Sequence, residues 1–304
     1  MFMRAQEDNL AMLALATRAK FSWATTRLQI EQLGSPTAVL DATYDGQLMN
    51  AARDAELQSA AERIAELEAR GIHVSTLVGD DYPAALRTVH DAPPVLYWQG
   101  MLSEADVNAV AIVGTRRPSE GGAAFARDLA HLLACHGTPV VSGLARGIDS
   151  EAMRSSLAAG GRTIGVIGTG HGVYYPRENA EMQDEIARSH LLLSQFAPGS
   201  APTKRTFPMR NIVMSGFSSA TVIAEAGETS GTRIQARAAV KHGRPLILSA
   251  HVANDVAWAR EMVETGFDVS VAHTADEAAE QIHGLHRRRD SAAQGWAFGA
   301  LLSV

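Results

Sequence analysis

Short apolar runs alternate with amphipathic segments over the last two thirds of the chain. Seven runs of five to eight residues are mostly apolar, at 107–114, 138–143, 162–168, 191–196, 219–226, 244–250 and 268–272. Runs of this length that are apolar on both faces are typical of strands buried in a parallel sheet. Helical patterns lie between them, such as 125–137 with its apolar stripe. The alternation predicts an α/β domain with a doubly wound, mostly parallel, Rossmann-like sheet.

The first third of the chain has a helical pattern instead. Two short helices are expected within 10–33, a longer helix at 47–71 and a short strand at 72–78. The stretch 79–100 is rich in Pro and Asp and predicts an ordered connector that packs on a neighbouring part through Tyr82, Leu86, Leu96, Tyr97 and Trp98. We therefore expect three parts. They are a small helical (SAM-like) domain with its connector at 1–107, the Rossmann-like domain at 108–284 and a tail at 285–304.

Composition narrows the class of protein. The 304 residues are 46% hydrophobic and 20% charged, which argues against a disordered chain or a coiled coil. The sequence lacks an apolar run long enough for a membrane helix and the apolar core of a signal peptide, so we expect a cytoplasmic protein without a membrane partner. A single cysteine, Cys135, makes neither a disulfide nor a thiolate cluster within the chain. No metal or cofactor is expected.

The net charge of −6 is unevenly distributed. Residues 1–107 carry −7, residues 108–283 carry −1 and residues 284–304 carry +2. Between Glu185 and Glu225 the chain has four basic residues and no acidic one. The overall charge argues against a protein that coats nucleic acid with its whole surface, but it leaves room for a local site.

Candidate binding residues follow the predicted strands, because parallel strands present their carboxyl ends at one edge of the sheet. The first strand is followed by Gly114, Thr115 and Arg116, and the second by Ser142, Gly143, Arg146 and Gly147. Backbone amides at a helix N-terminus bind anions, and an arginine adds a bidentate phosphate contact. The plainer interpretation of the first loop is a turn with solvated arginines. Asp149 is expected to be a helix N-cap, and His171 to be structural or solvated.

Two later segments complete the candidate site. The acid-free stretch contains Lys204, Arg205, Phe207, Arg210 and Asn211, a combination of cations and an aromatic ring that suits single-stranded nucleic acid. Phe207 is equally compatible with a role as a core plug. The segment Ser230, Gly231 and Thr232 is expected to open a helix and to form another backbone cradle for an anion.

These segments together resemble the DprA/Smf family of DNA-processing proteins. The resemblance rests on GTR at 114–116, SGLARGID at 142–149, FP-RN at 207–211 and EA---SGT at 225–232, supported by YP--N at 175–179 and PP-LY--G at 93–100. It spans roughly residues 10–285.

The resemblance implies a protein without catalytic chemistry that binds single-stranded DNA in natural transformation, protects it and loads a RecA-type recombinase. It also implies a homodimer. Carried over by position, the DNA pocket uses Arg116, Arg146, Lys204 and Arg210, with backbone amides near Gly114, Gly143 and 230–232.

Three features depart from the family pattern. Ile212 stands where the family has a basic residue, which removes one expected cation from the pocket. Residues 249–252 replace a proline-glycine turn. The last 20 residues leave no room for the winged-helix domain of many members.

Two other functions remain open at this stage. Related Rossmann-like phosphoribohydrolases cleave nucleoside monophosphates with a P-G-G-x-G-T-x-x-E signature, in which Gln235 takes the place of the glutamate. A neutral amide cannot act as that carboxylate, so a nucleotide-hydrolysing enzyme is disfavoured. The chain could also be a partner-binding module that has lost DNA binding, with its acidic N-terminal part as the docking surface.

Overall fold

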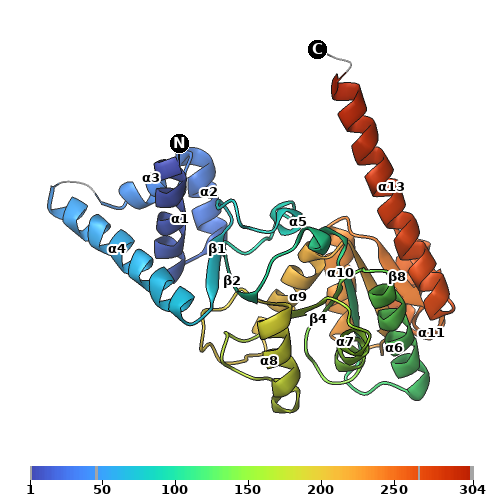
Figure 1. The fold of residues 1–304 in the computed structure, drawn as a ribbon. Helices are drawn as coiled ribbons and strands as arrows, with labels where there is room; N and C mark the ends of the chain where they lie inside the picture. The colour runs from blue at the N-terminus through green and yellow to red at the C-terminus, as the bar shows by residue number, and fades with distance from the viewer. Residues whose placement is uncertain (1, 45–46, 266–267, 302–304) are drawn as a thin grey trace.

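The protein folds around one nine-stranded sheet (Figure 1). The structure is a computed structural model that describes residues 2–44, 47–265 and 268–301, with side chains for 5–44, 50–265 and 268–291. The strand order across the sheet is β1-β2-β6-β5-β4-β3-β7-β8-β9. The strands are β1 His73–Thr76, β2 Val95–Gly100, β3 Val110–Gly114, β4 Val140–Ser142, β5 Thr163–Val166, β6 Leu191–Ser194, β7 Ala220–Glu225, β8 Leu246–Ser249 and β9 Val269–Ala272.

The seven strands from β6 to β9 along the sheet are parallel, and each coincides with one of the seven apolar runs. The predicted fold class is therefore confirmed. The connector prediction is wrong at β2, which pairs antiparallel with both β1 and β6. Pro93 and Pro94 directly precede this strand. Because prolines favour turns, we predicted a connector here, although the first half of the strand is buried.

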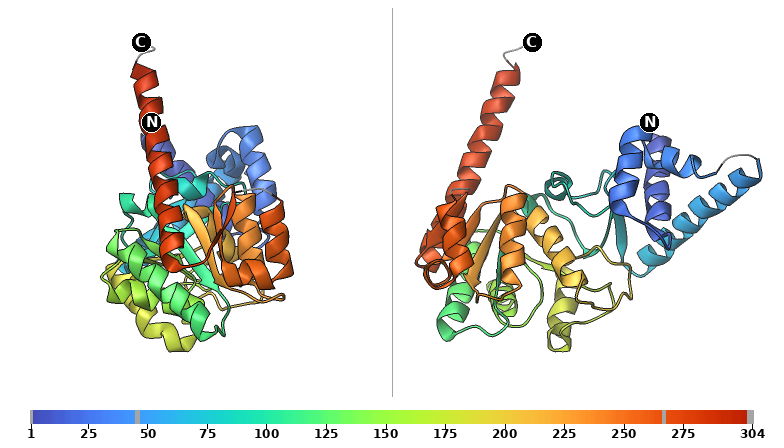
Figure 2. Two further views of the ribbon diagram at one scale, coloured as in Figure 1. Left: turned by 90° about the vertical axis from the view of Figure 1, so that its right-hand side faces the viewer. Right: turned by 180° about the vertical axis from the view of Figure 1, so that it is seen from behind.

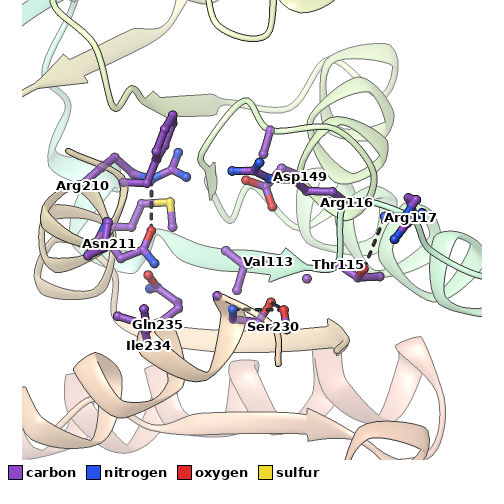
Figure 3. A pocket seen from close by; sticks show the side chains of 17 residues that line it. Val113, Thr115, Arg116, Arg117, Asp149, Arg210, Asn211, Ser230, Ile234 and Gln235 are labelled. Carbon is purple, nitrogen blue, oxygen red and sulfur yellow. Dashed lines mark hydrogen bonds between the residues drawn. The ribbon is translucent and has the colours of Figure 1, made fainter. Parts of the chain in front are cut away.

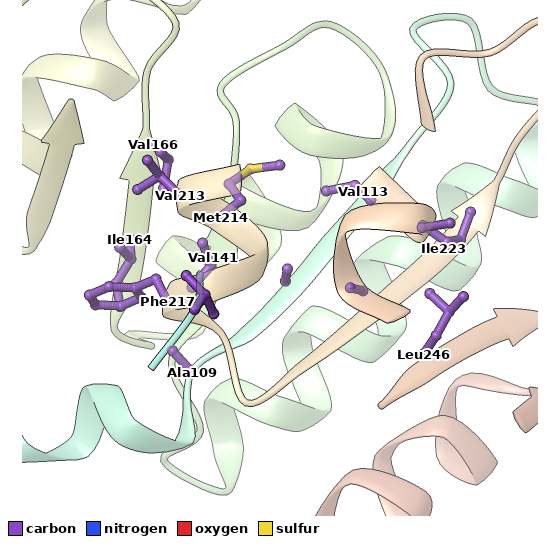
Figure 4. Close-up of a cluster of buried hydrophobic side chains, with 14 of the residues drawn as sticks. Ala109, Val113, Val141, Ile164, Val166, Val213, Met214, Phe217, Ile223 and Leu246 are labelled. Carbon is purple, nitrogen blue, oxygen red and sulfur yellow. The ribbon is translucent and has the colours of Figure 1, made fainter. Parts of the chain in front are cut away.

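Helices cover both faces of the sheet (Figure 2). One face carries α6 Glu120–Cys135, α7 Ile148–Ala158, α8 Ala180–Ser189 and α13 Ala275–Leu301. The other carries α5 Ala84–Arg87, α9 Thr206–Phe217, α10 Thr232–Lys241, α11 Ala250–Asp255 and α12 Ala257–Glu264. Val213, Met214 and Phe217 of α9 pack on β4 and β5 in the larger core (Figure 4). This packing sets the orientation of α9, which is central to the site. The structure also has two 3-10 turns, Glu104–Asn108 and Arg177–Asn179.

The N-terminal helices are α1 Phe2–Thr17, α2 Trp23–Leu33, α3 Pro36–Asp41 and α4 Gln47–Ala69. Gly34 ends α2 with a left-handed φ of 92°, and Ser35 caps α3 by accepting from the Ala38 amide. The core of this part contains Met12 and Leu13 together with Val95 and Tyr97 of β2. The helical part thus shares its core with the edge of the sheet. The division into three domains stays a prediction.

The C-terminal helix α13 is continuous through residues 284 and 285, where the sequence predicts the start of a tail. Its first turns pack on the sheet through Ala278, Ala279 and Ile282, and its second half projects away from the body of the protein (Figures 1 and 2). Among the helices of the described residues, none is both long and apolar enough to cross a membrane.

Candidate nucleic-acid interface

A cavity of about 450 Å³ lies where the chain reverses its direction of travel across the sheet. The chain runs outward from β3 to β6, then returns to β7 on the other side of β3. The loops after β3 and β7 diverge at this switch point, where open α/β sheets bind ligands. The first cavity is lined from β3, α9 and the start of α10 (Figure 3).

The two loops that follow β3 and β4 are packed against each other. Gly147 has a φ of 77°, and a Cβ there would come within 2.4 Å of the Thr115 carbonyl oxygen. That same oxygen accepts from the Ile148 amide at 3.2 Å. Glycine is required at position 147 both by this close approach and by its positive φ. The contact holds the 114–116 and 142–149 segments as one surface.

Arg210 and Asp149 form the buried end of the first cavity. Arg210 is 6% exposed, and its guanidinium donates to the carbonyl oxygens of Gly143 and Val166. Asp149 is 4% exposed and accepts from the Gly143 amide at 3.1 Å. Burial raises the pKa of the Asp149 carboxyl, and the nearby Arg210 charge opposes that rise. Asp149 is not the helix N-cap that we expected, because Gly147 takes that position in α7.

A second cavity of about 460 Å³ adjoins the first and shares Arg116, Phe207 and Arg210 with it. The Arg116 guanidinium lies 5.6 Å from the centre of the Phe207 ring, and the Tyr175 ring lies 5.4 Å from it. Arg146 lines this cavity and is paired with Glu178 at 2.6 Å on the surface. Half-buried Phe207 also packs over Gly168, so it is both a packing residue and a wall of the cavities.

The structure brings together most, but not all, of the predicted site. Eleven of the fifteen residues line one or both cavities, namely Gly114, Thr115, Arg116, Gly143, Arg146, Phe207, Arg210, Asn211, Ser230, Gly231 and Thr232. The other four line neither cavity. Ser142 is buried and donates to the Ile112 carbonyl oxygen, and Gly147 supports the loop. Lys204 and Arg205 are exposed on the segment that enters α9.

Gln235 is the most informative lining residue that the sequence did not assign to the site. It is 1% exposed, it lines the first cavity, and neither its amide nitrogen nor its amide oxygen has a partner in the described structure. It lies one turn after Thr232, and Figure 3 shows it on α10 below Asn211 of α9. The signal available in the sequence was its position one turn into a helix whose start we expected to bind an anion. Tyr174, Tyr175, Arg117 and Arg177 were also missed, although two adjacent tyrosines after a glycine-rich loop suggested a ring platform.

Ile212 does not lie in either cavity. An α-helix turns by about 100° per residue, which places Ile212 about 140° around α9 from Phe207 and about 100° from Asn211. It lines a separate cavity beside Trp23. Ile212 thus removes no cation from these two cavities, and its effect on DNA binding stays a prediction.

His171 has the structural role that was one of its two predicted alternatives. It is 1% exposed, its Nε2 lies 3.0 Å from the Tyr97 carbonyl oxygen, and its Nδ1 lies 3.0 Å from the Gln99 side-chain amide. Burial lowers its pKa to about 4. The imidazole is therefore neutral at physiological pH and links the loop after β5 to β2.

One group of side chains in the described residues brings three metal-binding atoms within 4.8 Å, from His90, Asp91 and His242. His242 Nε2 lies 2.7 Å from the Asp91 carboxylate, and its Nδ1 lies 2.9 Å from the Ser215 hydroxyl. Both ring nitrogens of His242 are thus satisfied without an ion. The cluster ties the connector before β2 to α9 and to the end of α10.

Fold and site together define a Rossmann-like α/β protein whose switch-point cavities are lined by arginines, aromatic rings and a helix N-terminus. Residues 73–282 match the family model of DNA recombination-mediator protein A. The chain belongs to this family, as the sequence motifs indicated.

Similar proteins agree with this assignment. The chain is 40% identical over 169 residues to the DNA processing protein DprA of Streptococcus pneumoniae, covering 56% of this chain and 60% of that protein. It is 40% identical over 168 residues to Protein Smf of Synechocystis sp., covering 54% of this chain and 42% of that protein. The matches thus span about half the length of these curated relatives.

Solved structures give the same picture. The X-ray structure of DprA from Streptococcus pneumoniae superposes with a TM-score of 0.65 at 26% identity, covering 91% of this chain and 95% of that chain. DprA from Helicobacter pylori, described for its single-stranded DNA binding mode, superposes with a TM-score of 0.61 at 30% identity, covering 71% of this chain and 96% of that chain.

Proposed function

We propose that this protein binds single-stranded DNA in the two adjoining cavities at the switch point. The observation that carries the proposal is the shared wall of Arg116 and Phe207, a cation over an aromatic ring between the cavities. Cations that follow a phosphate backbone and rings that stack on bases are what a single-stranded site requires. The Helicobacter pylori relative, with its single-stranded DNA binding mode, supports the same substrate class.

Each wall has a separate role in this proposal. Arg117 and Arg177, both exposed, contribute further positive charge at the mouths of the cavities. At the start of α10, the N-cap residue Gly231 lines the first cavity and offers its backbone amide to a phosphate, whereas the Ser230 and Thr232 amides already donate within the turn. Buried Arg210 acts by shaping the wall and by its charge, because its Nη1 already donates to two backbone carbonyl oxygens and its Nε to the Asn211 side-chain oxygen.

Fluorescence anisotropy with labelled oligothymidylate tests the proposal at two salt concentrations. Wild-type protein is expected to bind single strands more tightly than duplex of equal length, with affinity falling as salt rises. Arg116→Ala should weaken binding about tenfold and lower the salt dependence by roughly one phosphate contact. Arg237→Ala removes an exposed arginine that lines neither cavity, so it should bind as wild type. Absence of single-strand binding at low salt would overturn the proposal.

We infer that the protein has no nucleotide-hydrolysing activity of the phosphoribohydrolase type. The neutral amide of Gln235 faces the first cavity at the position where that chemistry needs a carboxylate. The buried carboxylate of Asp149 is held by the Gly143 amide. Release of free base from nucleoside monophosphates, followed by chromatography, would contradict this inference.

We further propose, from the family resemblance, that the protein acts in natural transformation as a homodimer that hands single strands to a RecA-type recombinase. Light scattering measures the molar mass in solution and so tests whether the protein is a dimer. A pull-down of purified RecA with the Arg116→Ala variant separates direct contact from bridging by DNA, because a direct partner is retained when DNA binding is weakened. Loss of RecA in parallel with loss of DNA would argue against direct contact.

A further inference from the structure

A third cavity, of about 560 Å³, lies between the N-terminal helices and α9. Its walls come from the end of α1, the start of α2, β2, the loop after β6 and α9. Most lining side chains are aromatic or apolar, including Phe21, Trp23, Tyr97, Phe196 and Ile212.

The first turns of α9 separate this aromatic cavity from the DNA-binding cavities. Phe207, Arg210 and Asn211 line the first cavity, whereas Met209 and Ile212 line the aromatic one. The 100° rotation per residue places these two sets on opposite sides of the helix. One helix therefore forms a common wall, and a strand that leaves the first site needs only to cross α9 to reach the next.

Two residues that line the aromatic cavity carry buried donors without a partner. Trp23 Nε1 and Gln195 Nε2 are both inaccessible to solvent, and neither has a hydrogen bond in the described structure. Both residues line the cavity. A buried donor without a partner is costly, and a ligand that reaches it and accepts its hydrogen bond recovers that cost. Two donors from distant segments on one aromatic cavity indicate a flat ligand that carries hydrogen-bond acceptors.

The local charges favour nucleic acid as the ligand. Arg63 lines the aromatic cavity, and exposed Lys204 and Arg205 lie on the segment that enters α9. The acidic lining residue, Asp91, already accepts from His242. The chain between Glu185 and Glu225, which supplies α9 and the loop after β6, has no acidic residue.

We propose that the aromatic cavity is a second subsite for an unpaired nucleobase of the same DNA strand. The base stacks between aromatic side chains, and its carbonyl oxygens accept from Trp23 Nε1 and Gln195 Nε2. The strand crosses the N-terminal turn of α9 with its phosphates near Lys204 and Arg205. This inference rests on the proposed single-stranded DNA binding at the switch point.

A series of oligothymidylates of increasing length tests the second subsite. The double variant Trp23→Phe, Gln195→Leu keeps the size of both side chains and removes both donors. It should bind the shortest oligonucleotides as tightly as wild type does. For the longest oligonucleotides its affinity should be about tenfold below that of wild type, because it lacks the contacts that wild type gains with length. Its melting temperature without DNA should equal or exceed that of wild type, because two unpartnered donors have been removed. The matched control Trp98→Phe, Gln32→Leu should keep the full dependence on length, because Trp98 Nε1 already bonds Ser75 and Gln32 is exposed.

The variant Ile212→Trp fills the aromatic cavity without touching its donors and should cause the same loss on long oligonucleotides. Wild-type dependence on length in both the double variant and Ile212→Trp would overturn the second subsite and leave the proposed function intact. Failure of wild-type protein to bind any oligonucleotide would instead overturn the proposed function. If Ile212→Trp abolishes RecA capture but keeps the dependence on DNA length, the cavity is a protein-docking site and the proposal is wrong.

Discussion

The guanidinium of Arg210 lies directly on the backbone of Gly143, to whose carbonyl oxygen it donates. A Cβ at position 143 would lie 1.8 Å from Nη1 of this arginine. Two motifs that are 67 residues apart in sequence therefore form one wall of the cavities. Glycine at 143 is explained by the space that the arginine needs.

Gly143→Ala is expected to displace Arg210 and to destabilise the protein by about 1–3 kcal/mol, since a buried charge loses its acceptors. Urea unfolding measures the change. The control Gly121→Ala adds a methyl group in the first turn of α6, where the nearest atom is 3.9 Å away, and should be neutral or slightly stabilising. Equal stability of Gly143→Ala and wild type would refute the role assigned to this contact.

Glu178→Gln is expected to strengthen single-stranded DNA binding about two- to fivefold at low salt. Glu178 pairs with Arg146 at the second cavity, and removing the carboxylate frees the guanidinium for a phosphate. Fluorescence anisotropy measures the affinity. Glu181→Gln removes an exposed carboxylate that forms no ion pair in the described structure, so a comparable gain there would point to general charge instead of the Arg146 pair.

Gln235→Leu should change stability and binding in opposite directions. The substitution removes two buried atoms that lack hydrogen-bond partners, so we expect the free protein to gain about 1–3 kcal/mol. DNA binding should weaken, because the first cavity loses a donor and an acceptor. Gln183→Leu is the matched control, since Gln183 is equally buried but donates to the Val173 carbonyl oxygen, and it should lose stability. A Gln235→Leu variant that is less stable and binds normally would contradict this assignment.

Stability should fall as the pH is lowered from 7 to 5, in part because of His171. The unfolded chain has a histidine pKa near 6.5, whereas burial lowers the pKa of folded His171 to about 4. The unfolded state therefore takes up the proton first, and this residue alone should cost about 2 kcal/mol by pH 5. Urea unfolding at both pH values measures the loss.

His171→Gln should remove that portion of the pH dependence, whereas replacing the exposed His131 should leave it in place. An unchanged pH dependence in His171→Gln would show that the buried imidazole does not carry the effect.

Two predictions were wrong because they considered only the sequence neighbours of each residue. Asp149 lies two residues after Gly147 at the start of a helix, where an N-cap was expected, yet its carboxylate accepts from the Gly143 amide. The connector before β2 contains two prolines, yet it leads into a strand that bonds β1 and β6. In both cases a contact with a distant segment outweighed the local preference.

The sequence by itself determined the seven parallel strands, their intervening helices, the loops at their carboxyl ends and the family, because periodicity and motif spacing are local properties of the chain. Only the tertiary structure decided that Arg210 is buried, that Arg146 is paired with Glu178, and that Ile212 lies on the far side of α9 beside Trp23. These facts depend on which segments pack together, and packing between distant segments is not encoded in any short stretch of sequence.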